Sequence, residues 1–319
     1  MKTPAHWKNR NITALALLPL GWLYAGITSL RLKVKKTQVA EKPVICIGNL
    51  TAGGTGKTPT AVSIAKILKK QGLNPFFVSR GYGGKLSGVI VDTRQHTPQQ
   101  VGDEPLLLAR EAGVSVNADR FQAAQKAINA GADIIVMDDG FQNPGLKKDI
   151  SFLVFDGGFG VGNAWPLPAG PLRENFDAGL KRADAVIIIG NDTTGLKERL
   201  HNLPVFSGKM QALPLEDTQT PAIAFAGIGR PEKFYNSLKE LGVRITKTFD
   251  FPDHHYYTEK ELRELIDLAW KEDAQLITTA KDFVKIPQEL RHHFKVLEIE
   301  IEWQDKAALE KFIRDKIKN

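Results

Sequence analysis

The chain has 319 residues, of which 25% are charged and 42% hydrophobic; it is too long for one small domain and long enough for two. Its single cysteine, Cys46, excludes an internal disulfide and a cysteine-ligated metal site, so a reducing compartment is expected. The net charge of +7 favours an acidic partner. Because the sequence has no zinc-finger, basic-region or aromatic RNA-binding motif, nucleic acid is not expected to be that partner.

An apolar segment without any charged residue occupies positions 12–30 and has basic residues on both sides. As a helix, it would be nearly long enough to cross the hydrocarbon core of a membrane. Pro19 inside the segment, the central positions of Trp22 and Tyr24, and the basic flanks favour a helix that lies in the membrane interface. A spanning helix and a buried core helix are the alternatives. We therefore predict a membrane-associated helix within residues 1–36.

Short apolar strands alternate with helices in the rest of the chain. In the first unit, strands are predicted at 44–47, 76–78, 89–91, 134–137, 152–155 and 186–189, with helices at 60–71, 104–112 and 119–130. After a connection at 203–221, strands are predicted at 222–226, 243–249, 276–279 and 296–299, with helices at 232–241 and 259–271. This alternation predicts an α/β fold with a mainly parallel sheet flanked by helices. We expect a P-loop domain at 37–205 and a smaller α/β domain at 206–319.

A glycine-rich loop stands between the first predicted strand and a helix. It consists of Gly53, Gly54, Thr55, Gly56, Lys57 and Thr58. Backbone N–H groups of such a loop surround phosphate oxygens, the lysine neutralises the phosphates, and the threonine hydroxyl can bind Mg²⁺. The usual pattern has glycine where this chain has Thr51, and a turn without a ligand is the alternative reading. The absence of a guanine-reading motif favours ATP over GTP.

Acidic residues at two further places complete the predicted nucleotide side. Asp138 and Asp139 follow the strand at 134–137, as a Walker B carboxylate does, and one of them is expected to hold Mg²⁺; a turn before Gly140 is the alternative. In a later loop, Arg173 is placed to face transferred phosphate, and Glu174 to join the metal shell. A surface ion pair between these last two residues is the alternative.

Transfer of phosphate to an alcohol requires a group that accepts its proton. Asp103 at a predicted helix start is a candidate base, although an aspartate there can also cap the helix. His254 and His255 lie in a loop of the second unit and are candidates for the same chemistry or ordinary surface residues.

These motifs together resemble the tetraacyldisaccharide 4'-kinase family, the lipid A 4'-kinases of Gram-negative bacteria. The matching segments are Gly-Asn at 48–49 with the loop at 53–59, Ser-Arg-Gly-Tyr-Gly at 79–83, Gly-Asp-Glu-Pro at 102–105, Asp-Asp-Gly-Phe-Gln at 138–142, Gly-Pro-Leu-Arg-Glu at 170–174, Asp-His-His at 253–255 and Thr-Thr-Ala-Lys-Asp at 278–282. They occur in the family's order and cover nearly the whole chain. Asn143 departs from the pattern, because the family commonly has histidine at that position.

The resemblance implies transfer of the γ-phosphate of ATP, with Mg²⁺, to the 4'-hydroxyl of a tetraacylated glucosamine disaccharide 1-phosphate in lipid A biosynthesis. It implies that Lys57 and Thr58 bind phosphate and metal, and that Asp103 is the base, oriented by His254 rather than His255. The implied metal shell comprises Asp138, Asp139 and Glu174. Weaker candidates for substrate or nucleotide contacts are Arg80, Arg120 and Gln142.

The resemblance further implies action at the cytoplasmic face of the bacterial inner membrane, and we expect a monomer. A membrane-attached P-loop switch ATPase that acts on a protein partner is the main alternative function. A soluble small-molecule kinase is a third.

Overall fold

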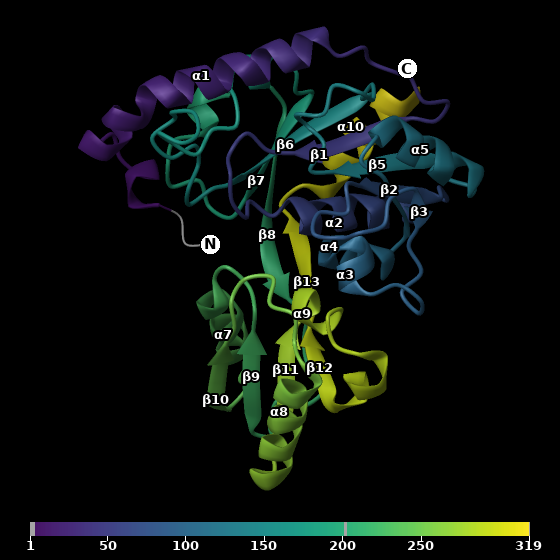
Figure 1. Cartoon of the computed structure of the whole chain (residues 1–319), viewed down its shortest axis with the longest axis vertical. Helices are drawn as coiled ribbons and strands as arrows, with labels where there is room; N and C mark the ends of the chain where they lie inside the picture. The colour runs from purple at the N-terminus through teal and green to yellow at the C-terminus, as the bar shows by residue number, and fades with distance from the viewer. Residues whose placement is uncertain (1–3, 201–202, 319) are drawn as a thin grey trace.

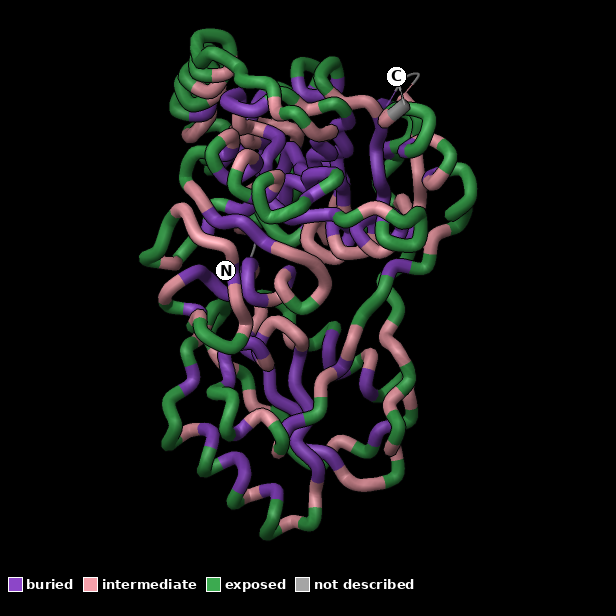
Figure 2. The backbone as a smooth tube through the Cα atoms, turned by 90° about the vertical axis from the view of Figure 1, so that its right-hand side faces the viewer, coloured by how far each residue is buried: buried purple, intermediate pink, exposed green. Residues whose placement is uncertain are grey.

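A computed structural model describes residues 4–200 and 203–318 of the chain. Two sheets form two lobes, the larger above the smaller in Figure 1. The large sheet has the strand order β13-β8-β7-β6-β1-β5-β2-β4-β3, and the small sheet the order β10-β9-β11-β12. Strands β8 and β13 reach from the upper lobe toward the lower one (Figure 1). Buried backbone is concentrated inside each lobe (Figure 2).

The large sheet is parallel except at its edges, where β3 and β13 run antiparallel to their neighbours. Its strands are β1 (Val44–Gly48), β2 (Pro75–Ser79), β3 (Val89–Ile90), β4 (Gly113–Val116), β5 (Ile134–Asp138), β6 (Ile150–Asp156), β7 (Ala185–Ile189), β8 (Val205–Ala212) and β13 (Ile299–Trp303). The central strands are buried on both faces, which is why their sequences are continuous apolar runs.

Helices cover both faces of the large sheet. One face packs on α2 (Lys57–Lys70), α4 (Asp103–Ala109) and α10 (Lys306–Lys318). The other packs on α5 (Arg120–Asn129) and α6 (Phe176–Leu180). Shorter elements of this lobe are η1 (Ala5–Trp7), α3 (Pro98–Val101) and η2 (Lys197–Arg199). Because the central strands are parallel, their carboxyl ends lie at the same edge of the sheet. Ligands commonly bind in the loops at this edge.

The smaller lobe is a second, fully parallel α/β unit. Its strands are β9 (Ala222–Ala226), β10 (Ile245–Asp250), β11 (Gln275–Thr279) and β12 (Phe294–Leu297). Its helices are α7 (Pro231–Glu240), α8 (Glu259–Lys271), α9 (Ala280–Phe283) and η3 (Gln288–His293). Separate apolar cores lie on the two faces of this sheet.

The predicted α/β fold, with a mainly parallel sheet and a second, smaller α/β unit, is confirmed. Several details of the prediction were wrong, and the C-terminal helix α10 was not predicted at all. Strand β4 was missed; the predicted connection at 203–221 contains β8; and the predicted strand at 296–299 is divided between β12 and β13, which belong to different sheets. Strand β8 is mostly half-buried or exposed, so it lacks the continuous apolar pattern of the central strands. The domain boundaries at 36/37 and 205/206 stay a prediction, and the topology adds that β13 and α10 pack with the large sheet.

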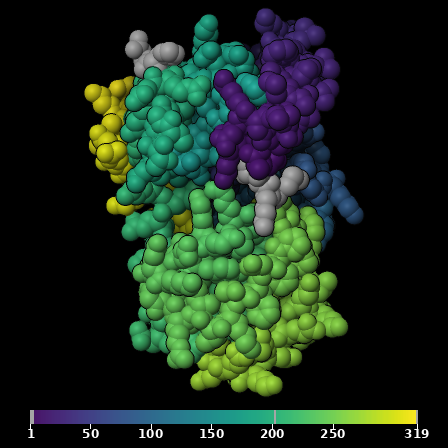
Figure 3. Space-filling view, turned by 90° about the vertical axis from the view of Figure 1, so that its left-hand side faces the viewer, coloured from purple at the N-terminus to yellow at the C-terminus, as the bar shows by residue number. Residues whose placement is uncertain are grey.

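The helix α1 (Ile12–Val34) lies along the surface of the larger lobe (Figures 1 and 3). Ala14 and Gly21, two turns apart on one face, are its buried residues. Only 11% of its most apolar window is buried, so α1 is not a core helix. Within the described part of the chain, it is the one helix long and apolar enough to cross a membrane. Its exposed apolar residues are Ile12, Leu15, Leu20, Trp22, Leu23, Tyr24, Ile27, Leu30 and Val34.

Both ends of α1 are tied to the larger lobe. Before the helix, Trp7 Nε1 donates to the carbonyl of Pro168 at 3.2 Å. After the helix, Thr37 Oγ1 donates to the carbonyl of Pro144 at 2.9 Å, and Gln38 N to that of Gly145 at 3.0 Å. These contacts hold the helix axis along the larger lobe.

Candidate active site

The glycine-rich loop connects β1 to the first turn of α2. Gly53 and Gly56 have φ angles of +119° and +89°, a region that residues with a Cβ rarely adopt. A Cβ added at Gly53 or Gly54 would meet no atom within 4 Å, so the loop opens to solvent at the helix N-terminus. Thr51 lies outside this cradle, buried and bridged to Leu172 of a neighbouring loop. The absence of glycine at position 51 therefore leaves the phosphate cradle intact.

Asp138 stands at the end of β5, directly beside the start of α2. Thr58 Oγ1 donates to Asp138 Oδ2 at 3.1 Å. The other oxygen of Asp138 is buried and has no hydrogen-bond partner among the residues that the structure describes. Burial, followed by the charges of Glu104 and Asp139, raises the pKa of Asp138 to about 7. Such a carboxylate gains from a nearby cation.

Asp139, by contrast, is partly exposed and forms ion pairs with two cationic side chains. Arg173 Nη1 lies 2.9 Å from Asp139 Oδ1 and 3.2 Å from Oδ2. Lys57 Nζ lies 3.8 Å from the same Oδ1. The structure thus brings Lys57, Thr58, Asp138, Asp139 and Arg173 together at one edge of the sheet, and their catalytic and metal-binding roles stay a prediction.

Glu174 has different partners. It is 4% exposed and forms an ion pair with Arg182, whose guanidinium also lies 4.5 Å from the ring centroid of Phe141. Gln142 Nε2 donates to Glu174 Oε1 at 3.0 Å and to the carbonyl of Asn49 at 2.8 Å. Glu174 and Gln142 therefore brace the base of the phosphate loop in this structure, and a place for Glu174 in the metal shell stays a prediction.

The two lobes meet at Asp103. This aspartate is the first residue of α4, and the helix cap is Gly102. Asp103 is 6% exposed, and its Oδ2 lies 2.8 Å from His254 Nδ1. His255 instead contacts Glu261 through Nε2 at 3.1 Å and stacks on Phe251. The structure places His254, and not its neighbour, against the predicted base.

Three residues of this region carried no predicted role. Lys281 Nζ lies 3.3 Å from His254 Nε2 and 3.4 Å from Asp253 Oδ1. Lys281 and Asp253 belong to segments that match the family, so the sequence marked their positions without indicating their contacts. No sequence signal marked Arg182, because its pairing with Glu174 depends on how two loops fold.

The weaker candidates lie around the same edge. Arg120 is 7% exposed and donates through Nη1 to the carbonyl of Asn117 at 2.9 Å. Burial, and then the charge of Arg80, lowers the pKa of Arg120. Asn143 Oδ1 accepts from Gly145 N at 2.8 Å, so its side chain closes a local turn.

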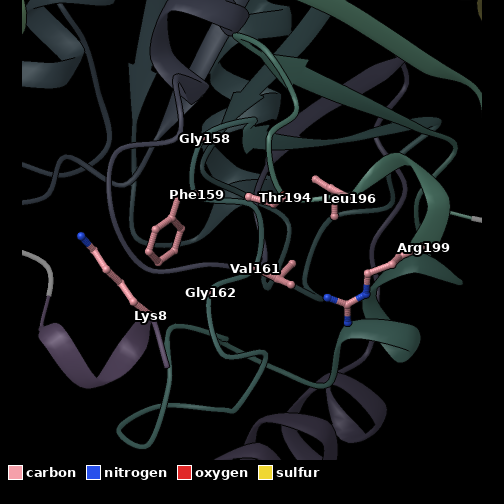
Figure 4. Close-up of a pocket in the computed structure, with 8 residues that line it drawn as sticks. All are labelled: Lys8, Gly158, Phe159, Val161, Gly162, Thr194, Leu196 and Arg199. Carbon is pink, nitrogen blue, oxygen red and sulfur yellow. The ribbon is translucent and has the colours of Figure 1, made fainter. Parts of the chain in front are cut away.

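A separate cavity of about 310 Å³ lies between the segment before α1 and two loops of the larger lobe (Figure 4). Its lining residues are Lys8, Gly158, Phe159, Val161, Gly162, Thr194, Leu196 and Arg199. None of the candidate site residues lines it. Among the described residues, 4–200 and 203–318, no group of three or more His, Cys, Asp or Glu side chains is arranged to hold a metal by itself.

Comparisons with known proteins match one family over nearly the whole chain. The model of a family described as tetraacyldisaccharide-1-P 4'-kinase, LpxK, matches residues 13–318. A tetraacyldisaccharide 4'-kinase of Paramagnetospirillum magneticum is 43% identical over 314 residues, which cover 97% of each chain. One of Rhodospirillum centenum is 43% identical over 325 residues, covering 98% of this chain and 96% of the relative.

A solved structure is also similar. The crystal structure of LpxK from Aquifex aeolicus in complex with ATP superposes with a TM-score of 0.81 at 27% identity. The superposition covers 96% of this chain and 100% of the other. The two-lobed arrangement is therefore shared with a nucleotide-binding protein.

Proposed function

The chain belongs to the tetraacyldisaccharide 4'-kinase family, and from this premise we infer that it transfers the γ-phosphate of ATP to the 4'-hydroxyl of tetraacyldisaccharide 1-phosphate in lipid A biosynthesis. The observation that carries the inference is the contact of 2.8 Å between Asp103 of the larger lobe and His254 of the smaller lobe. A switch ATPase needs only to position water, whereas an alcohol acceptor needs a group that takes its proton. The switch ATPase alternative is not favoured, because the relatives over nearly the full length are kinases.

ATP binds at the loop of Gly53 to Thr58. The open loop, the N-terminus of α2 and the ammonium group of Lys57 together provide the donors and the positive potential that phosphates require. A related structure with the same fold holds ATP. Arg173 pairs with Asp139, the carboxylate that also lies near Lys57. Arg173 and Lys57 can therefore face the same phosphates.

The residues at this edge also fit Mg²⁺. Asp138 presents a buried oxygen without a partner among the described residues, beside the hydroxyl of Thr58. Mg²⁺ in phosphotransfer sites is commonly held by one or two carboxylates together with the substrate phosphates, so a complete cage of side chains is not required. Asp138 and Thr58 would hold the ion, with Asp139 and Glu174 as further candidates. When bound, the ion would neutralise charge on the phosphates.

Asp103 acts as the base in this proposal. The O–H bond of the 4'-hydroxyl breaks, and its proton passes to the Asp103 carboxylate. The oxygen forms a bond to the γ-phosphorus while the bond from that phosphorus to the ADP oxygen breaks. His254 orients the carboxylate through the contact at Oδ2. Both residues come from one chain, so we propose that the enzyme acts as a monomer.

We propose that α1 lies in the interface at the cytoplasmic face of the bacterial inner membrane. Its apolar residues are exposed and both of its ends are tied to the larger lobe. An amphipathic lipid acceptor would then meet the site at the height of its head group. The exposed apolar helix and the ATP requirement support this placement.

The test is a phosphotransfer assay with γ-labelled ATP, Mg²⁺ and tetraacyldisaccharide 1-phosphate in detergent micelles. Label on the lipid that is lost in Lys57→Ala supports the proposal. ATP hydrolysis without labelled lipid, and stimulated by an added protein, would instead support the switch ATPase. Activity on the lipid that survives deletion of residues 1–36 would remove the membrane helix from the mechanism.

A further inference from the structure

The smaller lobe contributes a cation, as well as a histidine, to the meeting point of the two lobes. Lys281 is the second residue of α9, which contacts α4 of the larger lobe. Its Nζ lies 3.3 Å from His254 Nε2, the ring nitrogen that faces away from Asp103. His254 is thus held between a carboxylate on one side and an ammonium group on the other.

The backbone around Lys281 is fixed by a buried network. The next residue, Asp282, is fully buried and lies 2.7 Å from Lys285 Nζ. Tyr257 Oη donates to Asp282 Oδ1 at 3.0 Å, and Gly227 N donates to Oδ2 at 3.0 Å. Tyr257 belongs to the loop that carries His254. The network therefore joins the histidine loop to the start of α9 and sets the distance between His254 and Lys281.

The contact chemistry selects one form of the imidazole. A lysine ammonium group has three N–H donors and no acceptor, so a nitrogen in contact with it must offer a lone pair. His254 Nε2 therefore accepts, and the proton of the neutral ring lies on Nδ1. From Nδ1 it is donated to Asp103 Oδ2 across 2.8 Å. The backbone of His254 has a φ of +62°, a conformation that residues other than glycine rarely adopt. The surrounding contacts must stabilise this conformation.

We propose that Lys281 is a positioning residue for the reaction: it fixes His254 as the Nδ1–H tautomer, with Nε2 as the acceptor and Nδ1–H directed at Asp103. The charged groups that face the imidazole are Asp103 from α4, Asp253 from its own loop and Lys281 from α9, with Glu104 beside them on α4. Of these, Lys281 alone is a cation. Its contact with Nε2 leaves Nδ1–H directed at Asp103, which holds that carboxylate in the orientation in which it accepts the proton of the hydroxyl. The proposal rests on the proposed function, because it assigns Asp103 as the base.

The test compares Lys281→Met with Lys281→Arg in the full-length protein. The chain has 7 histidines, so ¹⁵N-labelled histidine gives few signals, and His254→Ala assigns the one of interest. In the nucleotide-free wild type we expect a protonated Nδ1 and an unprotonated Nε2. In Lys281→Met, the ring should lose this single tautomer, because the donor that holds Nε2 as an acceptor has been removed. Lys281→Arg should keep the wild-type pattern.

The kinetic readout separates positioning from binding. We expect Lys281→Met to lower kcat about tenfold, a part of the effect typical of a general base, with the KM for ATP within about twofold of the wild type. Lys260→Met is the matched control, because Lys260 lies in the same lobe with a side chain 87% exposed.

A wild-type ring with its proton on Nε2, or an identical nitrogen pattern in Lys281→Met, would overturn the proposal. The nitrogen pattern does not depend on phosphate transfer to the lipid. It therefore remains decisive if the kinase assay itself gives no product, an outcome that would count against the proposed function alone.

Discussion

The phosphate side and the acceptor side of the site are assembled in different ways. On the phosphate side, Lys57 and Thr58 follow β1 and Asp138 ends β5, its immediate neighbour in the sheet. On the acceptor side, Asp103 and His254 are 151 residues apart and belong to different lobes. The first arrangement is fixed by one buried sheet, whereas the second depends on how two lobes are placed against each other. The acceptor side should therefore be the easier one to disturb separately.

The largest expected effect comes from Asp103→Asn. The amide keeps the shape of the side chain but cannot accept a proton from the hydroxyl, so we expect kcat to fall about 10³-fold. The dissociation constant for ATP, measured by calorimetry, should change less than about twofold. Because Asp103 and His254 act together, a double variant with His254→Ala should lose little more than Asp103→Asn alone. Full turnover by Asp103→Asn would remove this carboxylate from the mechanism.

The next prediction concerns the stability of the smaller lobe, whose buried network supports the acceptor side of the site. Asp282→Asn leaves Lys285 buried without its charge partner, and both side chains are fully buried. We expect the free energy of unfolding of this lobe to fall by about 3 kcal/mol. Urea denaturation followed by circular dichroism measures the change. Adding Lys285→Met should recover part of the loss, and a double variant as unstable as the single one would contradict this account.

The contribution of α1 should be confined to the lipid acceptor. Trp22 is 65% exposed on α1, and Trp22→Ser removes an apolar side chain that we propose enters the membrane interface. The expected result is a rise of about tenfold in the KM for the lipid, measured in mixed micelles, with no change for ATP. Trp270→Ser is the control, because Trp270 is 77% exposed on the smaller lobe. Equal effects of the two substitutions would contradict a specific role for α1.

The smallest expected effect concerns Glu104, between the two sides. Burial raises its pKa, and the charge of Lys281 lowers it by less. An acid with a raised pKa binds protons more tightly in the folded state, so stability falls as the pH rises from the unfolded value of about 4.3 through the folded one. Glu104→Gln should flatten that part of the stability profile without nucleotide. A profile with the same slope as the wild type would show that Glu104 is not the group responsible.

The sequence predicted the features that depend on neighbouring residues or on a regular apolar pattern. The glycine loop, the central strands and the apolar helix were found in this way, and the parallel pairing of β1 with β5 brings Asp138 next to the phosphate loop. Strand β8 was missed because it is only partly buried. The resemblance to a family supplied the pairing of Asp103 with His254, which no local pattern indicates.

The amino-acid sequence by itself determined the α/β fold, the phosphate loop and the apolar helix. Each of these features depends on contiguous residues, whose backbone conformation or apolar pattern is local. Only the tertiary structure decided that Glu174 pairs with Arg182, that His255 contacts Glu261, and that Lys281 stands on the far side of the His254 imidazole. These contacts join loops of distant segments. Their geometry follows from the packing of two sheets and of the loops between them, which no short stretch of sequence specifies.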